Sequence, residues 1–278
     1  MKKTDTAIIS FTMASILTLL RIPLKLFNIS PDTGFYDRSN IFGSAFMVLF
    51  VFCLLLGAGM ALRNREDFKL PLRTGLIRAA TAFFTGCVIA GISAFELFFV
   101  AAPIQTGPNA VPPMLSRCGQ ILGIIGGISL VFMALSVFSG NSNRLGKIAS
   151  LTLPCWCAVS MLHDFMGFRF VLTASDQLMH TIFMLSATVF FLQLSKEIIY
   201  DCGSTLGIAL PAAVAFIAGV PLGISQLCTL VLVGDFVGGP SYLQVIHILV
   251  LCFFQFMFLL SPIKKRDPRL GEKSTEQL

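Results

Sequence analysis

The strongest constraint on the fold is a series of long apolar stretches, each close to the length that crosses a lipid bilayer. A helix needs about 20 mostly apolar residues to span roughly 30 Å of hydrocarbon. Applied along the 278 residues, this criterion predicts spans at 7–27, 41–62, 76–102, 119–139, 148–167, 177–195, 205–233 and 242–262. The sequence therefore predicts an all-α integral membrane protein, a polytopic bundle of about eight transmembrane helices.

The composition supports a lipid-facing surface. Charged residues make up 12% of the chain and the mean hydropathy is +0.84, whereas an average soluble domain has about 25% charged residues. The lipid bilayer is thus the main predicted partner. Although the formal net charge is +6, the basic residues fall in short clusters between apolar stretches and form no continuous basic stripe. We therefore expect no nucleic-acid partner.

The distribution of basic residues predicts the orientation. With the N-terminus in the cytoplasm, only Arg21, Lys25, Arg38, Arg117 and Arg169, which are five of the 20 Lys and Arg residues, fall on the outer side. Positive charges gather on the cytoplasmic side of membrane proteins. We therefore expect a cell-membrane protein with both termini in the cytoplasm.

The chain divides into two predicted parts. Residues 1–263 are expected to form a single transmembrane helical domain, and residues 264–278 a polar cytoplasmic tail that is disordered. In the first span we expect Arg21 and Lys25 to extend together to the outer headgroups. Lys2 and Lys3 before an apolar run also allow a cleaved signal peptide, but no small-residue cleavage site follows the run.

Small residues recur every four positions in the third, fourth and seventh spans. Such stripes let helix backbones approach closely and gain dispersion contact, so we expect these three spans at the centre of the bundle. The Phe-rich second, sixth and eighth spans are expected to face lipid. A pathway lined by backbone near Pro221, in a kinked or broken seventh span, is the alternative. The expected packing glycines are Gly119, Gly123, Gly127, Gly207, Gly219 and Gly223.

Ionisable residues from four spans fall at one predicted depth. With each span centred in the bilayer and a rise of about 1.5 Å per residue, they lie about 8 to 10 Å toward the outside. These residues are Glu96, His163, Asp164, His180 and His247. Asp176 lies one turn before His180 and is expected to orient its imidazole. Such groups in hydrocarbon usually face the bundle interior and find partners.

This outer polar layer has three interpretations. Its members can be ordinary residues at span ends in the headgroup region, they can line a pathway for a proton or a small polar solute, or they can hold a metal ion. Metal ligation has no sequence signature here, because no two histidines lie four apart with a glutamate between them. No cofactor is predicted, and the catalytic residues of any enzyme are unknown.

The polar layer and the Pro-interrupted seventh span favour a small-solute permease or transporter-like protein. A membrane-embedded, metal-dependent hydrolase that uses the same groups is the less favoured class, since no catalytic motif is present. A non-catalytic membrane subunit or sensor is the third possibility. The sequence does not predict an oligomeric state.

Overall fold

The computed structural model describes residues 3–30, 41–63, 76–100, 113–139, 149–167, 175–200, 205–234 and 241–260. These residues form eight helices and no strand. The helices are α1 (Lys3–Asn28), α2 (Ile41–Arg63), α3 (Leu76–Phe99), α4 (Pro113–Ser139), α6 (Thr152–Gly167), α7 (Ser175–Tyr200), α8 (Thr205–Leu232) and α9 (Tyr242–Leu260). The prediction of an all-α polytopic bundle is confirmed.

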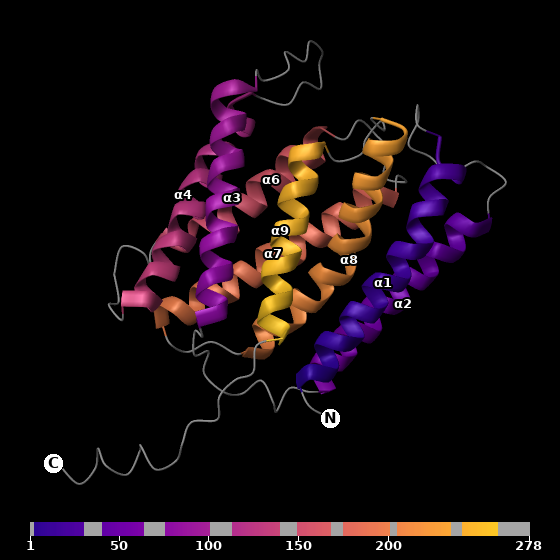
Figure 1. Cartoon of the computed structure of the whole chain (residues 1–278), viewed down its shortest axis with the longest axis horizontal. Helices are drawn as coiled ribbons and strands as arrows, with labels where there is room; N and C mark the ends of the chain where they lie inside the picture. Colours follow the sequence, from indigo (N-terminus) through magenta and orange to yellow (C-terminus); the bar gives the residue numbers. More distant parts are fainter. Residues whose placement is uncertain are drawn as a thin grey trace, which may run out of the picture.

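Seven of the eight helices are long and apolar enough to cross a membrane. The exception is α6, whose 16 residues correspond to about 24 Å of helix. Successive helices run in opposite directions, and α6 passes from the end of the bundle where α4 finishes to the end where α7 begins (Figure 1). The first helix starts and the last helix finishes at the same end of the bundle.

The two largest differences from the predicted helix boundaries, at the start of α4 and the end of α7, have a physical reason. α4 begins at Pro113 instead of residue 119. The prediction began later because the first turn of this helix is not apolar, but proline is well tolerated in a first helical turn. α7 continues to Tyr200 past the charged Lys196 and Glu197, since helical hydrogen bonding does not stop where the apolar run does. Pro211 and Pro221 both lie inside one continuous helix, α8.

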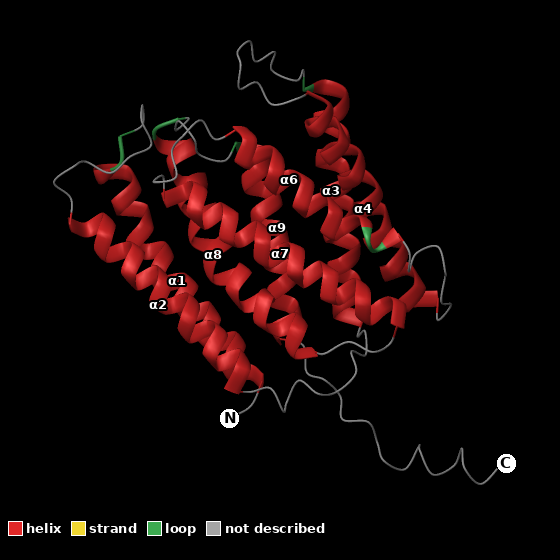
Figure 2. Cartoon of the chain, turned by 180° about the vertical axis from the view of Figure 1, so that it is seen from behind, coloured by secondary structure: helices red, strands yellow, loops and turns green. Residues whose placement is uncertain are grey.

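α8 is the central helix of the bundle. It packs against α1, α2, α7 and α9, and Figure 2 shows it between the α1–α2 pair and the remaining helices. Its buried face is rich in alanine. Because Gly219 and Gly223 have no side chain, the side chains of α7 and α9 approach the α8 backbone closely there, namely Phe183, Ile248 and Leu249. The central position expected for the seventh span is confirmed.

The expected positions of four other spans are only partly correct. α2 is largely exposed, as predicted, but so is α3, while α7 and α9 are more buried than either. Phe190 and Phe191 of α7 interlock with Phe254 and Phe258 of α9, with ring centroids 5.0 to 6.1 Å apart. A high phenylalanine content therefore marks helix packing here and not lipid exposure, because edge-to-face ring contacts stabilise a core.

α3 and α4 form the closest helix pair. A Cβ atom at Gly127 would lie 2.5 Å from the carbonyl oxygen of Gly86 and 2.6 Å from the backbone nitrogen of Ala90. The two backbones therefore touch, which is the geometry that small residues at intervals of four permit. This pair lies at one side of the bundle and not at its centre (Figure 1).

A buried charge cluster joins α1 to α7 and α8. Arg21 donates to Asp176 at 2.6 Å and to the Ser175 hydroxyl at 2.6 Å, and Lys25 contacts both Asp176 and the side-chain oxygen of Gln226. Arg21 and Lys25 are 0% exposed. The expectation that these two side chains extend to the headgroups is wrong, because a carboxylate on another helix offers them a buried partner.

Adding a single methyl group at the α3–α4 contact tests the close packing. Gly127→Ala is expected to lower the free energy of unfolding by about 1 to 3 kcal/mol, because backbone atoms cannot move aside without separating the helices. Gly91→Ala in α3 is the matched control, since a Cβ there meets nothing within 4 Å and alanine favours the helix by about 0.5 to 1 kcal/mol. Thermal unfolding in detergent measures both; equal effects would contradict the contact.

The charge cluster predicts a strong effect of its carboxylate. Asp176→Asn keeps the side-chain volume but removes the charge that both buried cations contact, and should destabilise the protein by about 3 to 5 kcal/mol. Asp267→Asn, in the polar C-terminal segment, serves as the control and should leave thermal unfolding in detergent unchanged. Unaltered stability of Asp176→Asn would show that the cluster is not a structural tie.

Candidate functional site

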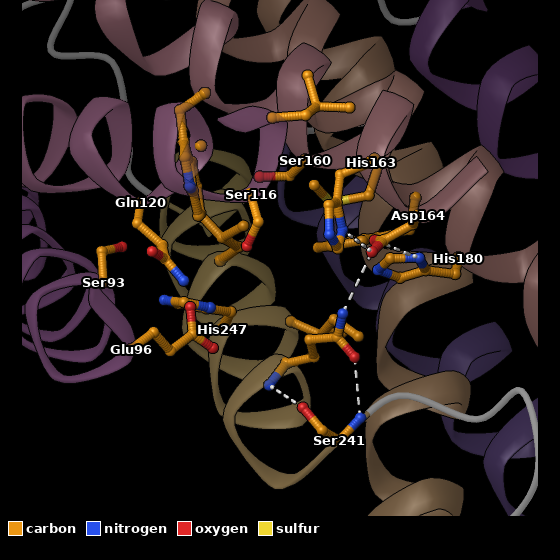
Figure 3. A pocket seen from close by; sticks show the side chains of 18 of the residues that line it. Ser93, Glu96, Ser116, Gln120, Ser160, His163, Asp164, His180, Ser241 and His247 are labelled. Carbon is orange, nitrogen blue, oxygen red and sulfur yellow. Dashed lines mark hydrogen bonds and ion pairs between the residues drawn. The ribbon is translucent and has the colours of Figure 1, made fainter. Parts of the chain in front are cut away.

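A pocket of about 310 Å³ lies in the half of the bundle where α3 and α6 end and where α4, α7 and α9 begin. All five helices contribute side chains to its wall. Glu96, His163, Asp164, His180 and His247 are among the lining residues, so the structure brings the five expected ionisable groups together (Figure 3). They belong to α3, α6, α7 and α9, which shows why no single stretch of sequence reveals the pocket.

Asp164 organises one side of the pocket. Its Oδ1 lies 3.3 Å from Nδ1 of His163, and its Oδ2 lies 3.5 Å from Nδ1 of His180. The side-chain N–H of Gln244 donates to Oδ1 of Asp164 at 3.3 Å. The side-chain carbonyl oxygen of Gln244 accepts a hydrogen bond from the backbone N–H of Ser241 at 2.9 Å. We call His163, Asp164, His180 and Gln244 the Asp164 cluster. One carboxylate thus holds two imidazoles and an amide from three helices.

Glu96, Ser93, Gln120 and His247 lie together on the other side of the pocket (Figure 3). Glu96 interacts electrostatically with His163 and Asp164, although none of the hydrogen bonds or ion pairs between described side chains involves its carboxylate. Among the described residues, the buried Nε2 of His247 also has no hydrogen-bond partner. This side therefore presents polar atoms that the protein itself leaves unsatisfied.

Trp156 forms part of the wall beside His247. The two rings are 5.4 Å apart and meet edge to face at 71°. Gly123 of α4 makes room for this arrangement, because a Cβ there would lie 2.9 Å from the indole nitrogen of Trp156. The glycine expected to pack helices thus also shapes the pocket.

The other expected packing glycines have different surroundings. Gly119 lines the pocket, and a Cβ there would make only ordinary contact with Val159 at 3.6 Å. Gly207 lies against the Gln193 side chain at 3.2 Å, which is a flexible neighbour. Close backbone packing therefore belongs to Gly127, while Gly219 and Gly223 are packed against side chains of α7 and α9.

Asp176 does not line the pocket. The prediction that it orients His180 is wrong, because its two carboxylate oxygens are used by Arg21 and Lys25, and His180 lies instead beside Asp164. A spacing of four on one helix showed only that the two side chains share a face. It could not show that another helix supplies a stronger partner for each.

Several lining residues were not singled out from the sequence. Ser93, Gln120, Trp156, Ser160 and Gln244 carry polar groups into the pocket. Serine is enriched where membrane helices pack, and glutamine can form hydrogen bonds between helices, so neither residue type by itself indicates a pocket. Trp156 offered one clue, since it is the single tryptophan of the chain and lies inside an apolar span instead of at its end. Arg169, expected on the outer side of the membrane, lies outside the described residues.

Metal binding finds no support in this geometry. Among the residues that the structure describes, no three His, Cys, Asp or Glu side chains are grouped so that they could hold a metal ion. The histidines are instead distributed around the pocket wall, with two of them on Asp164 and the third against Trp156. The arrangement suits contacts to an organic solute or to protons better than a coordination sphere.

Comparison of the chain with protein-family models, with curated proteins and with solved structures finds no match. The functional argument therefore depends on the geometry of the pocket.

The pocket predicts where a cysteine will react with a membrane-impermeant thiol reagent. In a variant that lacks all eight native cysteines, Ser160→Cys should be modified quickly, because Ser160 lines the pocket. Ser129→Cys should be inert, since Ser129 is 1% exposed and lies outside the lining, and buried thiols do not react. Labelling of sealed vesicles in both orientations measures the rates. Equal rates at the two positions, or access from both sides, would contradict a pocket open at one end.

Proposed function

We propose that the protein is a small-solute permease of the cell membrane, with its pocket open to the outside and both termini in the cytoplasm. The observation that carries the proposal is the convergence of Glu96, His163, Asp164, His180 and His247, from four helices, on one pocket of about 310 Å³. Ionisable side chains are costly in the membrane and mark solute or ion pathways when they line a cavity.

The size and wall of the pocket agree with a small solute. Its volume lies at the lower end of the range for small-molecule sites, which are mostly apolar with a few placed polar groups. Phe183, Met184, Ile248 and Leu251 supply apolar surface between the polar residues. A wall of this composition fits a solute with both a polar group and an apolar part.

The orientation rests on the basic residues. The pocket lies near the end of α3 and the start of α9. Figure 1 shows that this end of the bundle is opposite to the start of α1 and the finish of α9. By sequence, only five of the 20 basic residues fall at the end of the bundle that holds the pocket. The positive-inside rule therefore favours an orientation in which this end faces the exterior. The pocket would then receive solute from outside the cell.

Uptake into liposomes tests the permease. Vesicles that contain the purified protein are incubated with separate pools of amines, amino acids, sugars, nucleosides and carboxylates, and their contents are measured by mass spectrometry. At least one pool should accumulate faster than in vesicles with the Glu96→Gln, Asp164→Asn double variant, which keeps side-chain volume but removes both pocket charges. The same uptake for every pool in the two kinds of vesicle would overturn the proposal.

A further inference from the structure

We infer that the pocket binds a protonated primary amine, with the ammonium group held between Glu96 and His247. The inference rests on the proposed function, since it names the class of solute for the same pocket. It is carried by three features: the sign of the charges in the wall, the hydrogen-bonding capacity left over at Glu96 and His247, and the apolar surface beside them.

The wall is acidic. Among the described residues, the lining contains Glu96 and Asp164 but no lysine or arginine. Arg117, the nearest basic residue in the chain to the lining part of α4, is exposed and does not line the pocket. A cavity with one sign of charge and low-dielectric walls concentrates ligands of the opposite sign. An anionic solute would meet two carboxylates and no lysine or arginine in this lining.

The two carboxylates are not equivalent. Asp164 is already engaged by His163, His180 and Gln244 within the Asp164 cluster. Glu96 makes no such contact with described residues, although a carboxylate has about four acceptor sites. Glu96 is therefore the group with capacity for a cationic ligand.

The tautomer of His247 completes the site. The ring of His247 interacts electrostatically with the backbone of Ile89, and because Nε2 has no hydrogen-bond partner among the described residues, we assign this interaction to Nδ1. Ile89 lies inside α3, where its N–H is used by the helix, so its carbonyl accepts. A neutral ring that donates from Nδ1 keeps a lone pair on Nε2. His247 thus offers an acceptor.

An ammonium group matches this set of acceptors. It has three donors and no acceptor, and the same side of the pocket presents the Glu96 carboxylate, Nε2 of His247 and the side-chain oxygens of Ser93 and Gln120 (Figure 3). Trp156 lies in the same wall and can stabilise a cation over its ring. A quaternary ammonium would gain the charge contact but could donate no hydrogen bond.

The apolar part of the wall sets the rest of the solute. Phe183, Met184, Ile248 and Leu251 supply apolar surface to the pocket wall. A hydrocarbon or aromatic body attached to the ammonium would remove this surface from water, which favours binding. The solute class is thus a small amine with an apolar body.

The test uses four probes that share a phenyl body on the full-length protein in detergent at neutral pH, and only the quaternary probe is larger, by its three methyl groups. Phenethylammonium is the expected ligand, 2-phenylethanol is its neutral counterpart, phenylacetate is the anion, and trimethyl-phenethylammonium keeps the charge without N–H donors. The single tryptophan of the chain lies in the pocket wall, so Trp156 fluorescence reports binding without a label. Phenethylammonium should bind at least about tenfold more tightly than each of the other three.

Substitutions connect the binding to the named residues. Glu96→Gln and His247→Phe should each weaken phenethylammonium binding by about tenfold or more. Glu96→Gln removes the negative charge and one acceptor oxygen, and His247→Phe removes the Nε2 acceptor but keeps an aromatic ring. Glu96→Asp should restore part of the lost affinity, and Asp267→Asn should have no effect. Thermal unfolding of each variant shows that it is folded.

The outcomes separate the two proposals. The amine inference would be overturned if phenethylammonium did not bind, or if 2-phenylethanol or phenylacetate bound as tightly as phenethylammonium. It would also be overturned if sodium chloride displaced phenethylammonium but choline chloride did not. Each of these results would leave the permease open to another solute class, because liposome uptake tests it independently. Absence of uptake for every pool, with amine binding intact, would overturn the permease and keep the amine site.

Discussion

The cost of removing a charge from water governs the interior of this protein. In hydrocarbon, an ionised side chain needs an opposite charge, hydrogen-bond partners or contact with water. Arg21 and Lys25 meet this requirement through Asp176, on a helix about 150 residues further along the chain. The resulting ties fix α1 against α7 and α8, and α8 in turn contacts α2 and α9. The arrangement of the bundle thus depends on where its charges are neutralised.

The same requirement distinguishes the two polar regions of the interior. In the charge cluster, the Asp176 carboxylate contacts two cations, and Ser175 and Gln226 add further hydrogen bonds. In the pocket, the Asp164 cluster is satisfied internally, but Glu96 and Nε2 of His247 are not satisfied by described residues. Unsatisfied polar groups beside a cavity can be satisfied by water or by a ligand. The first region accordingly holds the fold together, and the second is available for binding.

The sequence was sufficient for features that depend on one helix at a time. Eight apolar stretches determined the helices, and counting residues from each span centre placed Glu96, His163, Asp164, His180 and His247 at a common depth. Whether these groups meet depends on helix rotation and neighbours, which hydropathy does not contain. For the same reason Arg21 was expected at the headgroups. A side chain near a helix end reaches either the membrane surface or a buried carboxylate, and only the position of α7 decides between them.

Helix neighbours also explain why the phenylalanine content was misleading and why the pocket exists where it does. Phe190 and Phe254 interlock, so α7 and α9 are held together in the half of the bundle away from the pocket. α3 contacts both α4 and α9, α4 contacts α6, and α6 contacts α7, so these five helices form a continuous row of neighbours along the pocket wall. Small residues bring α3 and α4 together at Gly86 and Gly127, and Gly123 leaves the space that Trp156 occupies. A larger side chain at residue 123 would collide with Ser93 and Trp156, which both line the pocket. Packing and binding therefore share one set of residues in α4, and the close approach of α3 to α4 is what positions Glu96 opposite the Asp164 cluster.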